Sequence, residues 1–253
     1  MRNIEQALLE HKQVILDAGY VEDQILGVFL YGSQNYGLAT ENSDVDTKVV
    51  IIPTLEDLCK NKKGFVKEYK YNDEKIVVMD IIHLMDNFKK QNINYVEVLF
   101  TEYKWVNPKH NFIWDYLVEI REQIAYYNKE RAVLSMGHQA LHTLKQDSSN
   151  PKKFAMATYL AHFLSVYIEG HLYRAPYQAA LYQPPHVREY ILALKKGEKK
   201  YTAMDVINLR KELEKIVYNT PQMLLMSDKT MQKKLDEHML QICVTAIRNL
   251  ENL

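Results

Sequence analysis

The chain has 253 residues, of which 47% are apolar and 25% charged, and its 32 basic and 32 acidic residues balance to zero net charge. This composition is ordinary for a globular protein and excludes collagen-like and disordered chains. The zero net charge excludes a protein that coats nucleic acid with an overall basic surface, although it is compatible with a local basic groove.

The sequence predicts a protein of the cytoplasm. Its first residues include the acid Glu5 and lack the apolar region of a signal peptide. The longest mainly apolar stretch, residues 154–168, is interrupted by polar side chains and is too short to cross a bilayer. The two cysteines, Cys59 and Cys243, lie far apart, which excludes a disulfide framework. We therefore expect a soluble cytoplasmic chain with no membrane partner.

Apolar periodicity predicts helices and strands in the first part of the chain. An amphipathic helix is expected at residues 3–18, because apolar residues recur there among charges. Two short apolar runs, the second ended by Pro53, indicate strands at 25–31 and 45–53. In chain order we then expect a helical turn at 54–58, a hairpin of strands at 65–71 and 75–83, and helices at 84–90 and 95–100.

The character of the sequence changes near residues 104–112. Beyond this point apolar residues recur at helical spacing to the end of the chain, and no stretch indicates a strand. We therefore predict an α/β domain over residues 1–106, followed by an all-α helical-bundle domain over residues 107–253.

The residues that could carry chemistry gather around the first two predicted strands. Gly32 and Ser33 close the first strand, where a glycine lets the backbone approach a phosphate and the following N–H groups attract an anion. Asp44 and Asp46 are two residues apart, so in a strand both carboxylates point to one face, where Mg²⁺ would relieve their repulsion. Lys48 shares that face and could neutralise a carboxylate or contact a phosphate. The pattern predicts a nucleotide and metal site.

A third carboxylate is expected from the later hairpin. Asp80 is a lone acid in an otherwise apolar strand, and burying a carboxylate without a partner is costly. If this strand pairs beside the strand of Asp44 and Asp46, metal ligation would offset the cost. The arrangement would then resemble the two-metal sites of phosphoryl transfer.

These residues resemble the polymerase β-like nucleotidyltransferase superfamily. The resemblance is carried by Gly32-Ser33, by Asp44-Val45-Asp46 ten residues later and by the strand acid Asp80. It implies an α+β fold, in which an N-terminal mixed sheet with flanking helices forms the catalytic domain ahead of the helical one.

A longer string resembles one group within that superfamily. Residues 31–48, YGSQNYGLATENSDVDTK, are similar to a bacterial and phage group of predicted nucleotidyltransferases linked to RNA repair. Residues 92–100 are similar to an Asn-Pro…Glu-Leu-Leu segment of that group, with Ile93 in place of the proline.

The resemblance implies roles for the residues that carry it. Gly32 and Ser33 would hold the β- and γ-phosphates of an NTP. Asp44 and Asp46 would ligate two Mg²⁺ ions, with Mn²⁺ as an alternative. Asp80 would ligate the catalytic ion and help to deprotonate the acceptor hydroxyl.

In the helical half, the resemblance implies that Lys152 and Lys153 contact the triphosphate. His138 and His142 have the spacing of zinc ligands on a helix. Because no third ligand accompanies them, a surface or packing role is favoured for this pair.

We therefore expect a Mg²⁺-dependent nucleotidyltransferase that transfers a nucleoside monophosphate from an NTP to an acceptor hydroxyl and releases pyrophosphate. An RNA 3′ end, such as a tRNA end, is the favoured acceptor. A protein hydroxyl, as in AMPylating antitoxin-like relatives, and a small molecule are the other acceptors. The alternative from a different class is a module that senses or binds a nucleotide without turnover.

Overall fold

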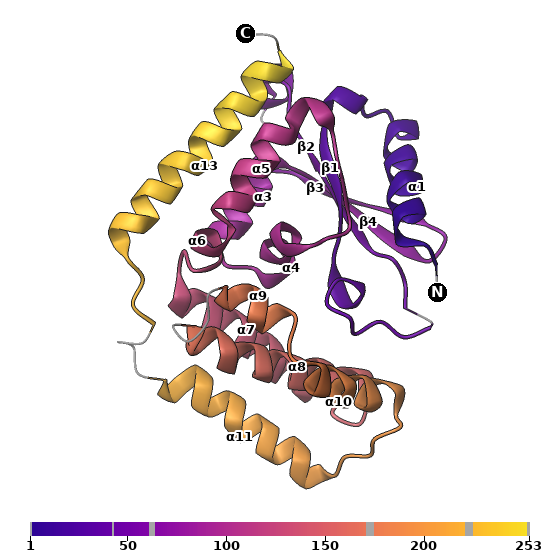
Figure 1. Cartoon of the computed structure of the whole chain (residues 1–253), viewed down its shortest axis with the longest axis vertical. Helices are drawn as coiled ribbons and strands as arrows, with labels where there is room; N and C mark the ends of the chain where they lie inside the picture. Colours follow the sequence, from indigo (N-terminus) through magenta and orange to yellow (C-terminus); the bar gives the residue numbers. More distant parts are fainter. Residues whose placement is uncertain (1, 42, 61–63, 171–174, 221–224, 252–253) are drawn as a thin grey trace.

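The chain folds around a five-stranded sheet with the strand order β3-β4-β2-β1-β5 (Figure 1). The computed structural model describes residues 2–41, 43–60, 64–170, 175–220 and 225–251. The strands are β1 (Ile25–Leu30), β2 (Thr47–Ile51), β3 (Val66–Tyr71), β4 (Glu74–Asp80) and β5 (Lys104–Val106). β2 and β4 run parallel, and the other neighbouring pairs are antiparallel. The expected α+β class with a mixed sheet is thereby confirmed.

Four of the five strands match the sequence-based prediction to within a few residues. The predicted hairpin of β3 and β4 turns at Asn72, whose φ of +54° is one that asparagine tolerates better than most residues. β5 was not predicted, because its three residues are too few for an alternating pattern to stand out. It pairs with β1 and extends the sheet on that side.

Helices make up the rest of the described elements. They are α1 (Ile4–Asp17), α2 (Leu55–Cys59), α3 (Ile81–Lys89), α4 (Ile93–Val96), α5 (Asn111–Glu119), α6 (Arg121–Ala125), α7 (Lys129–Gln146), α8 (Pro151–Ile168), α9 (Pro176–Leu181), α10 (Pro185–Lys196), α11 (Ala203–Asn219) and α13 (Lys229–Leu250). None of the helices in the described part of the chain combines the length and the apolar character needed to cross a bilayer.

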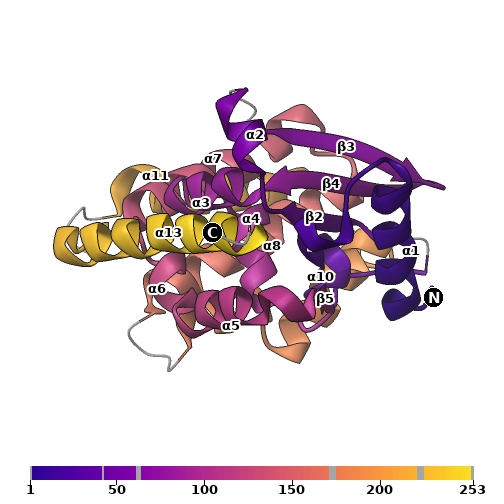
Figure 2. The same cartoon turned by 90° about the horizontal axis from the view of Figure 1, so that it is seen from above.

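α1 covers one face of the sheet (Figures 1 and 2). Asn3 caps the helix by accepting the Gln6 N–H, as expected of a residue at this position. Leu8 and Ile15 then pack with side chains of β1, β2 and β4 in one apolar cluster. This face of the sheet is therefore closed, and the site must lie at the other face or at a strand end.

A buried histidine ties α1 to the sheet. The ring of His11 is fully buried, with Nδ1 2.8 Å from Thr47 Oγ1 and Nε2 3.0 Å from Glu74 Oε2. Arg2 forms an ion pair with the same carboxylate. A neutral ring can accept from the hydroxyl and donate to the carboxylate, so both nitrogens are satisfied without charge. Burial lowers the pKa of His11, against the opposing pull of Glu74.

We expect acid pH to destabilise the fold through His11. Because the pKa of His11 is lower in the folded chain than its usual 6.5, the unfolded chain takes up this proton first as the pH falls below that value. The free energy of unfolding should then fall by up to about 1.4 kcal/mol per pH unit. Urea titrations between about pH 7 and pH 5 measure this slope. The control His11→Gln should have a shallower slope, and equal slopes would contradict the assignment.

The opposite face of the sheet packs against α3 and α5, and α13 runs alongside these helices (Figures 1 and 2). Phe29 of β1 stacks on Trp114 of α5, with 4.0 Å between ring centroids. Lys89 of α3 pairs with Asp236 of α13 at 2.9 Å. The end of the chain thus returns to the helices on the sheet.

Helices α7 to α11 form a further group below the sheet in the view of Figure 1. Its central member, α8, is buried along most of its length, and its residue Phe163 belongs to the same apolar cluster as Phe29 of β1. One core therefore extends across residue 106, and a division into two domains at that point stays a prediction.

Candidate active site

The first strand ends in a turn that requires a glycine. Gly32 has a φ of +79°, in the left-handed region that side chains disfavour, and it opens the 3₁₀ turn Gly32–Gln34. The Asn35 N–H donates to Gly32 O at 2.9 Å, and the Leu38 N–H donates to Ser33 O at 2.9 Å. The Gly-Ser turn expected after the first strand is therefore present, and these two bonds fix its shape.

The aspartate pair lies immediately before β2 and beside this turn. In the antiparallel pair of β1 and β2, Leu30 stands opposite Thr47. The Tyr31 N–H continues the pairing by donating to Asp46 O at 3.2 Å. Because Gly32 is the next residue along, the turn and the aspartates meet at the same end of the two strands.

The start of β4 holds the aspartate segment from the other side. The Val45 N–H donates to Glu74 Oε1 at 3.3 Å, and the Lys75 N–H donates to Asp46 Oδ1 at 2.9 Å. Asp44 is exposed and Asp46 is half-buried. Burial raises the pKa of Asp46 and the charge of Asp44 adds to this rise, whereas the Lys75 N–H opposes it. A cation bound between the two carboxylates would relieve both effects.

Lys48 is buried beneath the turn. Its side chain belongs to a residue that is only 3% exposed, and Nζ lies 3.1 Å from the ring centroid of Tyr31 and 5.2 Å from that of Tyr95. Burial lowers the pKa of Lys48, against the opposing effect of Glu97 and Asp46. Of the two roles considered for Lys48, this position suits neutralisation of a carboxylate better than contact with a phosphate.

Glu97 is a buried carboxylate that contacts the turn from within the protein, and no role was predicted for it. It begins the 3₁₀ segment Glu97–Phe100 and is 1% exposed. The Gly32 N–H donates to its carboxylate, with both oxygens 3.3 Å from the nitrogen. Burial raises the pKa of Glu97, while the Lys48 charge acts in the opposite direction. Two signals were available: Glu97 is the glutamate of the segment 92–100 that resembles Asn-Pro…Glu-Leu-Leu, and Lys48 and Glu97 are opposite charges that each interrupt an apolar run.

The structure does not bring Asp80 to the aspartate pair. β4 does lie beside β2, but the parallel register places Asp80 opposite Ile51, at the far end of β2 from Asp46. At the rise of a strand, this separates the two acids by about 16 Å along the sheet. The buried Asp80 carboxylate instead accepts the His83 N–H at 2.7 Å and the Phe65 N–H at 3.1 Å. These bonds cap α3 and offset the cost of burial that had suggested metal ligation.

Of the two predicted lysines, Lys152 lies close enough to Lys195 of α10 for its charge to act on that residue. Lys195 Nζ donates to Leu38 O at 2.7 Å, and burial, together with the nearby charge of Lys152, lowers the pKa of Lys195. Lys153 Nζ instead donates to Gln146 Oε1 on α7 at 3.4 Å. The loop that follows the turn is thus held by a hydrogen bond from Lys195 of α10, for which no such contact was predicted.

A cavity of about 510 Å³ lies beside the same loop. Its lining includes Gln34 and Gly37 of the loop, Tyr103 before β5, Gln178 of α9 and Arg188 of α10. The volume is in the range of small-molecule sites, and the lining combines amides, an aromatic ring and a guanidinium group. It offers space for part of a ligand whose phosphates bind at the turn.

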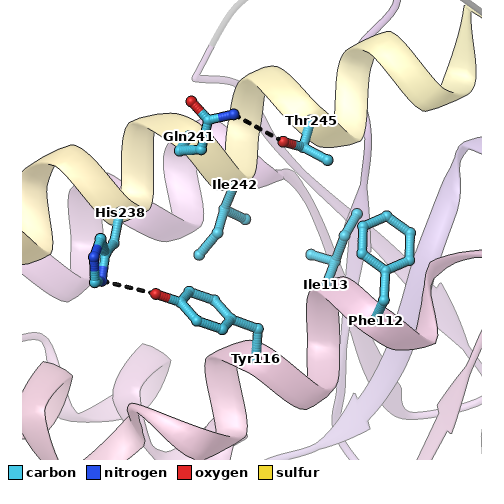
Figure 3. Close-up of a pocket in the computed structure, with 7 residues that line it drawn as sticks. All are labelled: Phe112, Ile113, Tyr116, His238, Gln241, Ile242 and Thr245. Atoms are coloured by element: carbon cyan, nitrogen blue, oxygen red, sulfur yellow. Dashed lines mark hydrogen bonds between the residues drawn. The ribbon is translucent and has the colours of Figure 1, made fainter.

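A smaller cavity of about 200 Å³ lies between α5 and α13 (Figure 3). It is lined mainly by apolar side chains such as Phe112, Ile113 and Ile242, and Tyr116 OH lies 2.8 Å from His238 Nδ1 at its end. None of the predicted site residues lines it.

Among the residues that the structure describes, no three His, Cys, Asp or Glu side chains come together as a metal site. His138 and His142 are exposed and contact other polar groups, with His138 Nε2 3.4 Å from Tyr218 OH and His142 Nε2 2.8 Å from Gln146 Nε2. Among the described residues, Asp44 and Asp46 are thus not joined by a third acid, histidine or cysteine as a possible metal ligand.

Comparison of the chain with known protein families finds no match, and neither does comparison with curated proteins. Among solved structures, the chain is similar to a crystal structure described as a nucleotidyltransferase-like protein from Exiguobacterium sibiricum. The two share 17% sequence identity with a TM-score of 0.33, over 98% of this chain and 78% of the other.

Proposed function

We propose that the chain is a nucleotidyltransferase, which transfers a nucleoside monophosphate from a Mg²⁺-bound NTP to an acceptor hydroxyl, with an RNA 3′ end as the favoured acceptor. The observation that carries the proposal is the register of β1 on β2, which sets the glycine turn beside the aspartate pair. Backbone N–H groups of such a turn attract phosphate, and paired carboxylates attract the cation that accompanies it. Both parts of a Mg–nucleotide complex thus find ligands at one end of the sheet.

Asp44 and Asp46 fit a magnesium ion that arrives with a nucleotide. Mg²⁺ is usually held by one or two carboxylates together with substrate phosphates and water. The pair would meet this requirement. Burial, with the like charge of Asp44 added, raises the pKa of Asp46, and a bound cation would offset both effects. The pair alone suits one such ion, and Asp80 is left out of our proposal because it lies at the other end of the strands. When bound, the ion would neutralise charge on the phosphate oxygens.

The chain's own residues would bind and orient the nucleotide. The backbone that follows Gly32 would contact the phosphates, and the Lys75 N–H would fix the direction of the Asp46 carboxylate. The Lys75 side chain, which pairs with Glu68 at 2.7 Å, adds a positive charge near Asp46 and would favour the charge that develops on the transferred phosphate. The cavity beside the loop would hold a further part of the nucleotide or the acceptor.

One observation favours the second candidate, a module that binds a nucleotide without turnover. The residue of β4 that meets Asp46 is Lys75, and among the described residues no third His, Cys, Asp or Glu joins the pair as a possible metal ligand. No residue outside the aspartate pair is then assigned to take the proton of an acceptor hydroxyl. A binding module needs only the turn and the aspartates.

The experiment that separates the two candidates uses each of the four α-³²P-labelled NTPs with Mg²⁺ and total cell RNA or protein. We expect label on an RNA species with one or more NTPs and release of pyrophosphate. Label on protein would instead identify a hydroxyl of a protein as the acceptor. Saturable Mg²⁺-dependent binding of an NTP without any labelled product would favour the binding module. Absence of both binding and product would contradict the site itself.

A further inference from the structure

The Gly32–Ser33 turn is held from inside the protein by one charged side chain. The carboxylate of Glu97 accepts the Gly32 N–H, and Glu97 is almost completely buried. Glu97 belongs to the segment after α4, whereas Gly32 follows β1, so this contact joins two parts of the chain that are 65 residues apart. Gly32 has a positive φ, which is only one of the backbone conformations open to a glycine in an unrestrained chain.

We infer that Glu97 is the positioning residue of this turn and holds the turn in the shape that binds phosphate. Lys48 is the buried opposite charge that offsets the Glu97 carboxylate, so that an anionic ligand can bind at the turn. The inference rests on the proposed function, because it gives the turn a phosphate to bind. It concerns a residue that does not touch the nucleotide, and it assigns Lys48 a role different from phosphate contact.

Lys48 has two contacts that suit this role. A carboxylate buried under a phosphate site would repel the phosphate unless a cation were close by. Burial raises the pKa of Glu97 and the charge of Lys48 opposes this rise. Lys48 Nζ lies over the ring of Tyr31, the residue directly before Gly32. Tyr95, two residues before Glu97, brings a second ring to the same ammonium at 5.2 Å. The two opposite charges offset each other beneath the turn, and Lys48 packs against Tyr31, the residue before Gly32.

The contact between Gly32 and Glu97 also determines which backbone N–H groups of the turn can bind a ligand. The Gly32 N–H points inward to Glu97 and is not available to a ligand. The groups left for a phosphate are therefore those that start at Ser33. A turn that is already held in its bound shape avoids the entropy of ordering on binding, which is how a residue remote from the ligand increases affinity.

The test replaces the pair without changing net charge. Lys48→Met/Glu97→Leu removes both buried charges together, so that neither charge is left buried without an opposite charge nearby. It takes away the acceptor of the Gly32 N–H. Lys48→Met/Glu97→Gln is equally neutral and of similar size but keeps an oxygen acceptor. The two double variants thus differ mainly in whether the Gly32 N–H has a partner.

Two quantities are measured on the full chain: hydrogen exchange of the Gly32 amide by NMR, and the affinity for tripolyphosphate with Mg²⁺ by calorimetry. We expect the Leu variant to exchange at least about tenfold faster and to bind about tenfold more weakly, as expected for loss of a buried bond to a charged group. The Gln variant should keep most of the slow exchange at Gly32 and most of the affinity of the unchanged protein. Glu122→Gln is the matched control, because Glu122 accepts the Tyr177 and Gln178 N–H groups of α9 and no donor of the turn, and it should change neither quantity.

The outcomes separate this inference from the proposed function. Exchange and affinity within about twofold of the unchanged protein in the Leu variant would overturn the role of Glu97. Equal losses in the Leu and Gln variants would also overturn it, because the acceptor would then not be the cause. If the unchanged protein binds no Mg–tripolyphosphate, the phosphate site and with it the proposed function would fail, whatever the exchange at Gly32.

Discussion

Asp46→Asn should abolish nucleotide transfer and leave the fold at least as stable as before. The amide keeps the oxygen that accepts the Lys75 N–H, so the segment should hold its place. It loses the charge that Mg²⁺ requires, and we expect turnover to fall by about 10²- to 10³-fold, the range of a lost electrostatic contact to the reacting phosphate. Mg²⁺-dependent binding of NTP should weaken as well.

The stability part of this prediction follows from the raised pKa of Asp46. A carboxyl whose pKa is higher in the folded chain than its usual 3.8 is more easily charged when unfolded, so its charge opposes folding above that pH. Melting temperatures without metal should therefore be equal or higher for Asp46→Asn near neutral pH, and the difference should disappear in acid.

Asp73→Asn provides the matched control, since Asp73 is an exposed acid in the hairpin turn and should change neither activity nor stability. Near-normal turnover in Asp46→Asn would remove the metal role from the pair. A large fall in its melting temperature would show that the carboxylate is structural.

The sequence allows prediction of the part of the site that lies close together along the chain. The turn at Gly32 and the acids at Asp44 and Asp46 flank two strands that run antiparallel with a single connection, so their approach follows from the chain path. The alternating hairpin of β3 and β4 is equally local.

What could not be predicted depends on long-range register. Apolar periodicity shows that a strand is buried but not which residue of a parallel neighbour stands opposite. Asp80 could therefore be placed on the correct strand but not at the correct end. The approach of Glu97 to Gly32 and Lys48 is of the same kind, because it depends on how the segment after α4 returns to the turn that follows β1. Two opposite charges in separate apolar runs are a signal that such a pair exists.

Asp80→Ala should destabilise the protein strongly and leave turnover per folded molecule nearly unchanged. Its two oxygens accept the His83 and Phe65 N–H groups in a fully buried position. Removing them leaves two backbone donors without partners and takes the cap from α3. Together these losses should lower the free energy of unfolding by about 2–4 kcal/mol, or the melting temperature by roughly 5–15 °C. Asp80→Asn keeps one acceptor, for the His83 N–H, and should lower the free energy of unfolding by about half as much.

Comparing the turnover rate with the thermal stability of each variant decides whether Asp80 belongs to the catalytic site. Single-turnover rates, corrected for the folded fraction, are measured beside melting curves for Asp80→Ala, Asp80→Asn and Thr202→Ala. Thr202 caps α11 from an exposed position, so its loss should cost only about 1 kcal/mol and show what a cap alone contributes. A rate that falls by about 10²-fold or more in Asp80→Asn, with the melting temperature unchanged, would return Asp80 to the catalytic residues. That result would require β2 and β4 to pair in a different register, since a carboxylate about 16 Å from Asp46 along the sheet cannot share its metal ion.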